Sequence, residues 1–383
     1  MHFFGNRSIN FIYAHSALHG LSQQIGGIFV FVFLVKAGIA MHFVLLSFAA
    51  IVLCRLVFRQ IAVPFAIRYG LRQAFIFGVV VGAVAYVPLG FVHGLSPMLA
   101  VFLLIHALGD AFYWSCYHAT TARLGDQKSR GAQVSAVQLI YASSAIIGPL
   151  IGSSTQVYLG SVFAFMLAGC VRLLSAIPLL QIMYTTAMPK GVVDAKSKRF
   201  AWRIYFFDGV TTTGINLSWT MALFITLNQN FQTYGLALSG AAIVGAIMGL
   251  GIGRLVDLGH HRWSVAFGMS AMSLFAVAAA FGYRDPFTAI IALALSAVAG
   301  PLYASAFNAR VYNVAKVSGD ALRFHVVGEG GWDVGCALGC CAAAFMVWHG
   351  FDYGWPIALG LIGISGVSVV LFRSYQNDDP SLR

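Results

Sequence analysis

The chain has 383 residues, of which 59% are hydrophobic and 9% are charged, with a formal net charge of +11. Soluble domains carry about 25% charged residues, so this composition excludes a soluble protein and predicts one that crosses a lipid bilayer several times. The positive charge does not indicate nucleic-acid binding, because the Lys and Arg residues lie between the apolar segments, where membrane insertion requires them.

The apolar segments predict an all-α polytopic membrane protein. Runs of about twenty apolar residues form helices in a bilayer, because only helices and closed barrels satisfy every backbone polar group there. These runs are too long and too continuous for barrel strands. The twelve predicted spans are residues 9–35, 42–67, 74–94, 98–121, 132–157, 160–183, 204–227, 237–256, 263–283, 287–311, 324–348 and 355–372.

The loops between these spans are short except for the polar segment 184–203. It is predicted to be a cytoplasmic linker between an N-terminal six-helix bundle, residues 1–183, and a C-terminal one, residues 204–383. With a cytoplasmic N-terminus, seventeen of the 23 Lys and Arg residues fall in cytoplasmic segments and two fall outside. This bias predicts that both termini are cytoplasmic and that the protein lies in a bacterial-type inner (cytoplasmic) membrane.

The six cysteines all lie within apolar segments, and none of them forms a C-x-x-C pair. They are therefore predicted to be small buried side chains, with no disulfide, metal or other cofactor. No small-residue cleavage site follows the first apolar run, so no cleaved signal peptide is expected.

Glycines recur in the two halves of the chain. The matching positions are Gly70 and Gly259, Gly109 and Gly300, Gly148 and Gly335, and Gly152 and Gly339. An internal duplication into two bundles is typical of secondary transporters, in which one half moves against the other around a central site. Two bundles that pack on each other need no further subunit, so a monomer is expected.

Two motifs resemble those of the major facilitator superfamily. The segment after the eighth span is similar to the family's cytoplasmic loop signature; it reads Gly253-Arg-Leu-Val-Asp257-Leu-Gly259-His-His-Arg262. This resemblance implies that the acidic residue and the basic residues form a charge-relay latch between helices on the cytoplasmic side. Its counterpart after the second span keeps Gly70 and Arg72. However, Pro64 stands in place of the leading glycine and Arg68 in place of the acid.

The second motif, Gly148-Pro149-Leu-Ile-Gly152 in the fifth span, is similar to the family's antiporter motif, and this resemblance implies export. Physically, the two glycines allow neighbouring helices to approach, and Pro149 is expected to bend its helix because it lacks a backbone N–H. The arginine that many family members carry in the fourth span is not evident; Asp110 and His118 occupy that region.

The resemblance further implies that the first, fourth, seventh and tenth spans line a central cavity. The fourth span carries His106, Asp110, Tyr113, Tyr117 and Thr121 within a sector about 80° wide. The candidate substrate-binding residues are His15, His19, Gln23, Arg55, Arg59, His106, Tyr113, Trp114, Tyr117, Asp208, Thr212, Trp219, Tyr303 and Arg310. The aromatic members would suit an aromatic or amphipathic small molecule by stacking, and ordinary helix packing remains an equal alternative.

Asp110 is the first candidate for proton coupling, because a carboxylate near the bilayer midplane needs water or a partner. Arg55 and Arg59 could pair with it or bind an anionic substrate. Asp333 and Glu329 are the second and third candidates. They stand four residues apart on one helix, so a shared proton, or a cation such as Arg310, would relieve their repulsion.

These patterns predict a proton-coupled secondary transporter that moves a small organic solute by alternating access, with export favoured. Proton-linked uptake of an organic anion remains the alternative, because of Arg55, Arg59 and Arg310. A membrane-embedded haem or metal protein, using His15, His19 and His106, is a minor one. No nucleotide-binding loop, nucleophile elbow or H-E-x-x-H is present in the sequence, so an enzyme is not expected.

Overall fold

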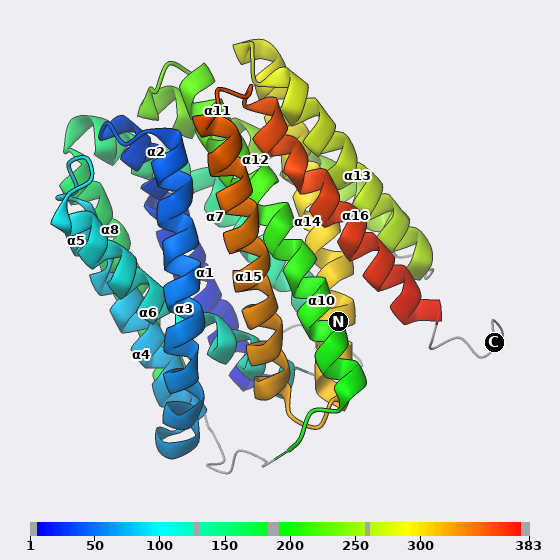
Figure 1. Cartoon of the computed structure of the whole chain (residues 1–383). Coiled ribbons are helices and arrows are strands. Elements are labelled where there is room, and N and C mark those ends of the chain that lie inside the picture. The colour runs from blue at the N-terminus through cyan, green and yellow to red at the C-terminus, as the bar shows by residue number, and fades with distance from the viewer. Residues whose placement is uncertain (1–5, 126–129, 183–190, 257–260, 377–383) are drawn as a thin grey trace.

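The computed structural model describes residues 6–125, 130–182, 191–256 and 261–376, and almost all of them are helical (Figure 1). The helices are α1 (Arg7–Ile25), α2 (Val30–Lys36), α3 (Met41–Tyr69), α4 (Leu71–Val84), α5 (Tyr86–Leu89), α6 (Pro97–Leu124), α7 (Arg130–Tyr158), α8 (Ser161–Leu174), α9 (Ala176–Leu180), α10 (Ala195–Thr212), α11 (Trp219–Thr226), α12 (Phe231–Val256), α13 (His261–Gly282), α14 (Pro286–Val317), α15 (Ala321–Trp348) and α16 (Gly354–Gln376). A 3₁₀ turn, Gly27–Phe29, joins α1 to α2, and a π-helical turn, Thr213–Ser218, joins α10 to α11.

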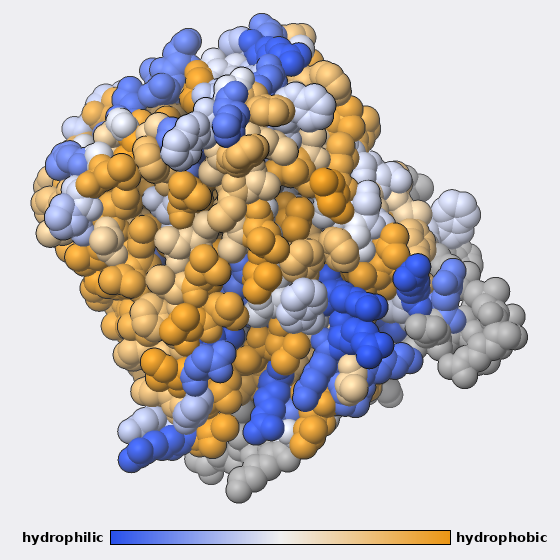
Figure 2. Space-filling model, viewed as in Figure 1, coloured by the Kyte–Doolittle hydropathy of each residue, from blue (hydrophilic) through white to orange (hydrophobic). Residues whose placement is uncertain are grey.

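The predicted fold class is confirmed. Among the described residues, eleven helical segments are long and apolar enough to cross a membrane. The remaining predicted span, at 204–227, is helical as well, but its polar start and its π-helical turn keep it out of that group. Apolar side chains form a broad belt around the visible face, with hydrophilic groups gathered at its two ends (Figure 2), as a bilayer requires.

Besides the seventh span with its π-helical turn, three predicted spans are interrupted helices, and glycine or proline accounts for each of these three breaks. The first span breaks at Gly26 and Gly27, where two residues of poor helix propensity follow each other. The other breaks, at Ala85 and Ser175, come three residues before Pro88 and Pro178, whose rings disturb the preceding turn. In contrast, α7 continues as one helix through Pro149.

The seventh helix begins nine residues before the predicted start of its span at 204, inside the segment predicted to be the linker. Helix α10 starts at Ala195, and the Asp194 side chain caps it by accepting a hydrogen bond of 2.9 Å from the Ser197 N–H. The residues that follow are mostly polar, so hydropathy could not reveal them as helix. Residues 184–190 lie outside the described part, and the division into two bundles stays a prediction.

The repeated glycines of the fifth and eleventh spans lie at equivalent helix contacts. A Cβ atom on Gly148 or Gly152 of α7 would come 3.1 Å from the Gln24 carbonyl carbon or 3.0 Å from that of Ile25 in α1. On α15, a Cβ on Gly335 would come 2.8 Å from the Phe206 carbonyl carbon of α10. Glycine therefore permits the close packing of the fifth span on the first and of the eleventh on the seventh.

Two helix pairs make the most extensive contacts between the predicted first half and the second. Helix α3 packs on α15, and the two run side by side in Figure 1, while α7 packs on α12. Any movement of one half against the other would have to separate or shear these contacts.

Candidate functional site

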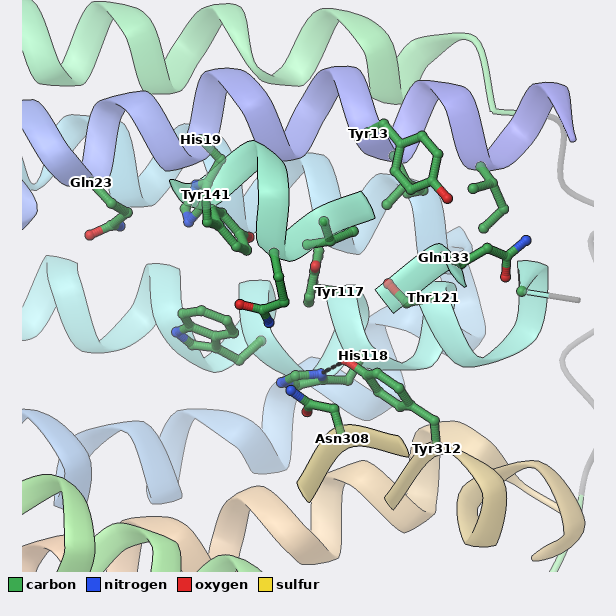
Figure 3. A pocket seen from close by; sticks show the side chains of 16 residues that line it. Tyr13, His19, Gln23, Tyr117, His118, Thr121, Gln133, Tyr141, Asn308 and Tyr312 are labelled. Atoms are coloured by element: carbon green, nitrogen blue, oxygen red, sulfur yellow. Dashed lines mark hydrogen bonds between the residues drawn. The ribbon is translucent and has the colours of Figure 1, made fainter. Parts of the chain in front are cut away.

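A cavity of about 200 Å³ lies between α1, α6, α7 and α14 (Figure 3). Its polar lining is formed by Tyr13, His19, Gln23, Trp114, Tyr117, His118, Thr121, Gln133, Gln138, Tyr141, Asn308 and Tyr312. As far as the structure describes this wall, it contains no Lys, Arg, Asp or Glu. The cavity is therefore suited to an uncharged or weakly basic amphipathic molecule with aromatic surface.

A second cavity, of about 410 Å³, follows α1 from Gln23 toward Phe31. Asn216, Thr220 and Ser296 give it polar groups from the π-helical turn, α11 and α14. Because Gln23 lines both cavities, one side of the first span, formed by α1, the 3₁₀ turn and the start of α2, is a continuous wall from Ile9 to Phe31.

His19 is the residue of the first cavity best placed to bind a solute. Its ring lies 4.3 Å, centroid to centroid, from Tyr113 in a stacked arrangement and is almost fully buried. Neither ring nitrogen has a hydrogen-bond partner among the described residues. A buried polar group without a partner costs about 1–3 kcal/mol, so a solute or water molecule that bonded to His19 would be favoured.

His118 connects this cavity to a group of charged residues. Its Nδ1 atom lies 2.9 Å from the Tyr312 hydroxyl, a hydrogen bond drawn in Figure 3. Its Nε2 atom lies 3.6 Å from Glu329 Oε1 on α15. The imidazole thus has one edge at the cavity and the other beside a buried carboxylate.

The charged group consists of Arg55 and Arg59 on α3 and Glu329 and Asp333 on α15, and is here called the ion cluster. Arg55 Nε and Arg59 Nη1 each donate a hydrogen bond of 2.5 Å to Asp333, which is fully buried. Glu329 lies 3.6 Å from the Nη2 atoms of both arginines. Trp332 covers the cluster, with the Arg55 guanidinium 4.5 Å from its ring. Two cations and two carboxylates therefore balance one another across the α3–α15 contact.

Arg55 and Arg59, rather than Arg310, supply the cations beside Glu329 and Asp333. The Arg310 guanidinium donates hydrogen bonds of 3.0 and 2.9 Å to the side chain and backbone of Ser374 and stacks over Tyr375. It therefore lies at the end of α14 against α16, away from both cavities.

Asp110 occupies a different place from the one expected of a cavity residue. It lies 3.4 Å from Arg172 Nη2 and 3.5 Å from His106 Nε2, and neither cavity is lined by it. The polar stripe of α6 is therefore divided. Its later part, Tyr117 and Thr121, faces the cavity, whereas its earlier part faces α8 and the Arg172 side chain.

His15 and Tyr113 also face the interior of the first six spans. The His15 Nδ1–H donates a hydrogen bond of 2.8 Å to the Ser175 carbonyl, and its Nε2 accepts one of 3.2 Å from Tyr113. Of the candidates on the first span, His19 and Gln23 line the cavity.

The candidates on the seventh span do not share one face of a cavity. Asp208 accepts hydrogen bonds of 2.6 Å from Tyr303 and 3.1 Å from Trp332. Trp219 packs on Phe275, and Thr212 is half-buried at the end of α10. On the tenth span the first cavity meets Asn308 and Tyr312. Tyr312 is nine residues from Tyr303, and at about 100° per residue it lies on the opposite side of the helix.

The loop motifs are only partly described. Gly70 ends α3 with a φ of +99°, a left-handed conformation that favours glycine, and Arg72 donates hydrogen bonds of 3.3 and 3.2 Å to the Leu180 and Ile182 carbonyls. Asp257 and Gly259 lie outside the described residues. Gly253 and Arg262 belong to α12 and α13, but their surroundings are not described.

Sequence reasoning missed the roles of His118, Tyr141, Asn308 and Tyr312 at the cavity, and of Trp332 over the ion cluster. His118 carried the clearest signal, since it is a polar residue eight positions after Asp110 in an apolar helix. The others gave none, because an aromatic or amide side chain in a span is equally compatible with packing. Within the described chain, no three His, Cys, Asp or Glu side chains gather as metal ligands would.

Comparison with known proteins shows the same architecture. The crystal structure of the human organic anion transporter MFSD10 (TETRAN) matches with a TM-score of 0.68 and 13% identity, over 96% of this chain and 98% of that one. The E. coli fucose:proton symporter FucP matches with a TM-score of 0.65 and 14% identity, over 96% and 99%. No curated protein matches the sequence.

A family model supports the same conclusion from the sequence. The model described as Major Facilitator Superfamily matches residues 13–226, which is more than half of the chain. Together with the helical architecture and the cavities along α1, this match identifies the chain as a member of the Major Facilitator Superfamily.

Proposed function

We propose that this protein is a proton-coupled secondary transporter that exports a small organic solute from the cytoplasm in exchange for protons. The family comprises transporters rather than enzymes, and its fold supports transport of small molecules by alternating access. The proposal adds the coupling ion, the direction and the residues. It also places the protein as a monomer in the cytoplasmic membrane with both termini inside, as the Lys and Arg distribution favours.

The ion cluster is the observation that carries the proposal. It links α3 to α15, so opening the protein along this contact separates Arg55 and Arg59 from Asp333 and Glu329. Next to the arginines the negative charges of the carboxylates are balanced, whereas a carboxylate separated from them would be an unpaired charge within the membrane, which a proton would neutralise. Opening would thus take up a proton, and closing would release it.

His118 would carry protons between the ion cluster and the cavity that binds the solute. A proton reaching the first cavity can bind the imidazole at the Tyr312 side, and the opposite nitrogen can pass a proton to Glu329. His19 and Gln23 would hold the solute by hydrogen bonds, and Trp114 and Tyr117 would stack on it. Asp333 and Glu329 therefore come before Asp110 as coupling residues.

The lining of the cavities favours export of a neutral or weakly basic compound over uptake of an organic anion. Neither cavity is lined by Lys or Arg in the part of the chain that the structure describes. Arg55 and Arg59 are occupied by Asp333, and Arg310 by Ser374. An anion would find no unbalanced positive charge at either wall.

A thermal-shift screen of small amphipathic compounds at two pH values would identify ligands, because a bound ligand raises the apparent stability by mass action. Each ligand would then be tested in proteoliposomes that carry the transporter and a pH gradient. An exporter accumulates the compound when the lumen is acidic, and a symporter accumulates it when the outside is acidic.

The Asp333→Asn variant tests the coupling in the same vesicles. It should lose accumulation driven by the pH gradient while still exchanging labelled for unlabelled solute. Asp352→Asn, which neutralises an exposed carboxylate outside the spans, serves as the matched control. Unchanged accumulation by Asp333→Asn would refute the role of the ion cluster.

A further inference from the structure

The structure has a basic groove on its outer surface that the transport mechanism does not use. A cavity of about 550 Å³ between α10, α14 and α16 is lined by five cations: Lys196, Arg199, Arg203, Arg310 and Arg373. In Figure 2 hydrophilic side chains gather in this part of the face, at the lower ends of α10 and α16. The rest of the wall is mostly apolar, with Phe200 and valines of α14 and α16.

A second hollow of about 550 Å³ continues this groove along α10 and α16. The two share Arg203, Arg373 and two valines of α16, and the continuation is lined mainly by apolar side chains such as Phe206, Phe207 and Ile362. One end of the groove is therefore strongly positive, and the other end is an apolar trough.

The charges at the polar end have no counter-charge in the part of the protein that the structure describes. None of the acidic side chains there forms an ion pair with Lys196, Arg199, Arg203 or Arg373. Arg310 at the wall is held in position by a hydrogen bond to Ser374 and by stacking over the Tyr375 ring. A cluster of like charges that is held together without partners favours an anion between them.

The groove lies on the surface that faces lipid. Trp202 is 42% exposed beside the cations, and tryptophan at this position is typical of the level of the lipid headgroups. Ile362 is 60% exposed in the trough and lies near the middle of α16, which is long and apolar enough to cross a membrane, so acyl chains are expected beside it. A ligand that fits must therefore combine an anionic headgroup with an apolar chain.

We propose that this groove binds one anionic phospholipid, with its phosphate among Lys196, Arg199, Arg203 and Arg373 and an acyl chain in the trough between α10 and α16. Clusters of Lys and Arg between helices at a membrane surface bind anionic lipid headgroups through the charge and hydrogen bonds of the guanidinium groups. Such a lipid would hold α10 to α16 and is separate from the solute cavities.

The test compares phosphatidylglycerol with phosphatidylcholine on the purified full-length protein, using native mass spectrometry and thermal unfolding. The variant R203Q/R373Q removes two cations from the groove. The control K198Q/R68Q removes two exposed cations outside it, one of them on the same helix.

The wild-type protein and the control should bind and be stabilised by phosphatidylglycerol in preference to phosphatidylcholine. The double variant should bind phosphatidylglycerol roughly thirty-fold more weakly, and each single variant, R203Q or R373Q, about five-fold more weakly. The single variants answer the question if the double variant does not fold.

Three outcomes would overturn the proposal. Equal binding of the two lipids would show that the protein does not select an anionic headgroup. Equal affinity of the wild-type and R203Q/R373Q proteins would show that the lipid binds outside this groove. If soluble glycerol phosphate stabilises the protein as well as phosphatidylglycerol does, the groove is a site for a soluble anion and needs no acyl chain.

Discussion

At the scale of single residues, Asp333 is the point on which two arginines converge. Arg55 and Arg59 both donate hydrogen bonds to it, and all three side chains are almost fully buried. A buried charge that loses its partner costs about 3–5 kcal/mol, whereas losing both partners together costs less. The stability of the closed protein should therefore depend on whether the positive and negative charges of these residues remain equal, rather than on any one residue.

A double-mutant cycle tests this balance. Asp333→Asn should lower the free energy of unfolding by about 3 kcal/mol or more, because both arginines lose an ionic partner. Arg59→Gln combined with Asp333→Asn should be more stable than the sum of the single effects by about 1–3 kcal/mol. Unfolding in a fixed detergent measures all four proteins, and strictly additive effects would show that the two residues are not coupled.

His118 is the second residue whose role can be tested alone. His118→Phe keeps an aromatic ring against Trp114 but can neither accept nor donate a proton. Because a positioned proton carrier contributes about a hundred-fold or more, accumulation driven by a pH gradient should fall steeply, while exchange of solute at equal pH persists. His93→Gln, at an exposed position, is the control; a loss of exchange in His118→Phe would assign the residue to solute binding instead.

A pH-dependent contribution to the free energy of unfolding is expected at the surface, where the Asp352 carboxylate pairs with the Arg284 guanidinium at 3.1 Å. Partial burial raises the pKa of Asp352, but hydrogen bonds from Tyr283, the Gly354 N–H and Arg284 outweigh it and hold the pKa below its ordinary value. A lowered pKa adds stability above the ordinary carboxyl range, and this stability is lost as the pH falls through the folded-state pKa.

The Asp352→Asn variant should therefore be less stable than the wild type at neutral pH, by less than about 1 kcal/mol for an exposed pair. The difference should shrink as the pH falls below about 4. Melting curves at a series of pH values measure it, and a difference that grows on acidification would contradict the assignment.

At the scale of helices, glycine decides which pairs can pack closely. A Cβ on Gly335 would come 2.8 Å from the Phe206 carbonyl carbon, whereas a Cβ on Gly300 would have nothing within 4 Å. Both residues lie inside long helices, but Gly300 precedes Pro301, whose ring restricts an alanine there, so the gain in helix propensity is smaller at Gly300. They differ in the space around them.

Gly335→Ala should therefore lower the free energy of unfolding by about 1–3 kcal/mol, because α15 must move away from α10. Gly300→Ala should leave it unchanged or raise it by up to about 1 kcal/mol. Thermal unfolding compares the two variants directly. Equal effects would mean that α10 and α15 are not in close contact in the membrane.

At the scale of the whole molecule, alternating access requires the two predicted bundles to move against each other. Ser153 of α7 and Gly235 of α12 belong to different bundles, and a Cβ on Gly235 would lie 2.5 Å from that of Ser153. Gly90 and Val162 belong to the same bundle, and the corresponding distance is 3.5 Å. The Gly90–Val162 distance already suits a disulfide, whereas the Ser153–Gly235 pair must move apart by about 1 Å to form one.

In a variant without its six native cysteines, oxidation of Ser153→Cys/Gly235→Cys should reduce transport to background, and a reducing agent should restore it. Oxidised Gly90→Cys/Val162→Cys should transport normally. Transport by the first protein after complete cross-linking would refute movement of the bundles at this contact, and with it the division at residues 183 and 204.

Hydropathy was sufficient to predict the helices, because burial in a bilayer constrains the length and composition of every span. It failed at residues 195–203, where a helix extends into water and its polar side chains resemble a loop. It could not predict which side of a helix meets a cavity, since that direction depends on the neighbouring helices. Tyr303 and Tyr312 lie on one helix, yet only Tyr312 lines the first cavity.

Charged residues within the spans illustrate the same limit. Asp110 and Asp333 look alike in the sequence, as carboxylates near the middle of apolar helices. The first pairs with His106 and Arg172, and the second with Arg55 and Arg59 across a contact between the two predicted halves. The partner decides the role of a buried carboxylate, and it comes from a helix far away in the sequence.

The π-helical turn at Thr213–Ser218 gives the seventh span one residue more than an α-helix of that length would hold. If that extra residue is absorbed into α-helical winding, everything beyond it turns by about 100° relative to α10. Asn216 and Thr220 would then rotate off the wall of the second cavity and apolar neighbours would take their place. A single backbone rearrangement would thus change which side of this span lines the second cavity.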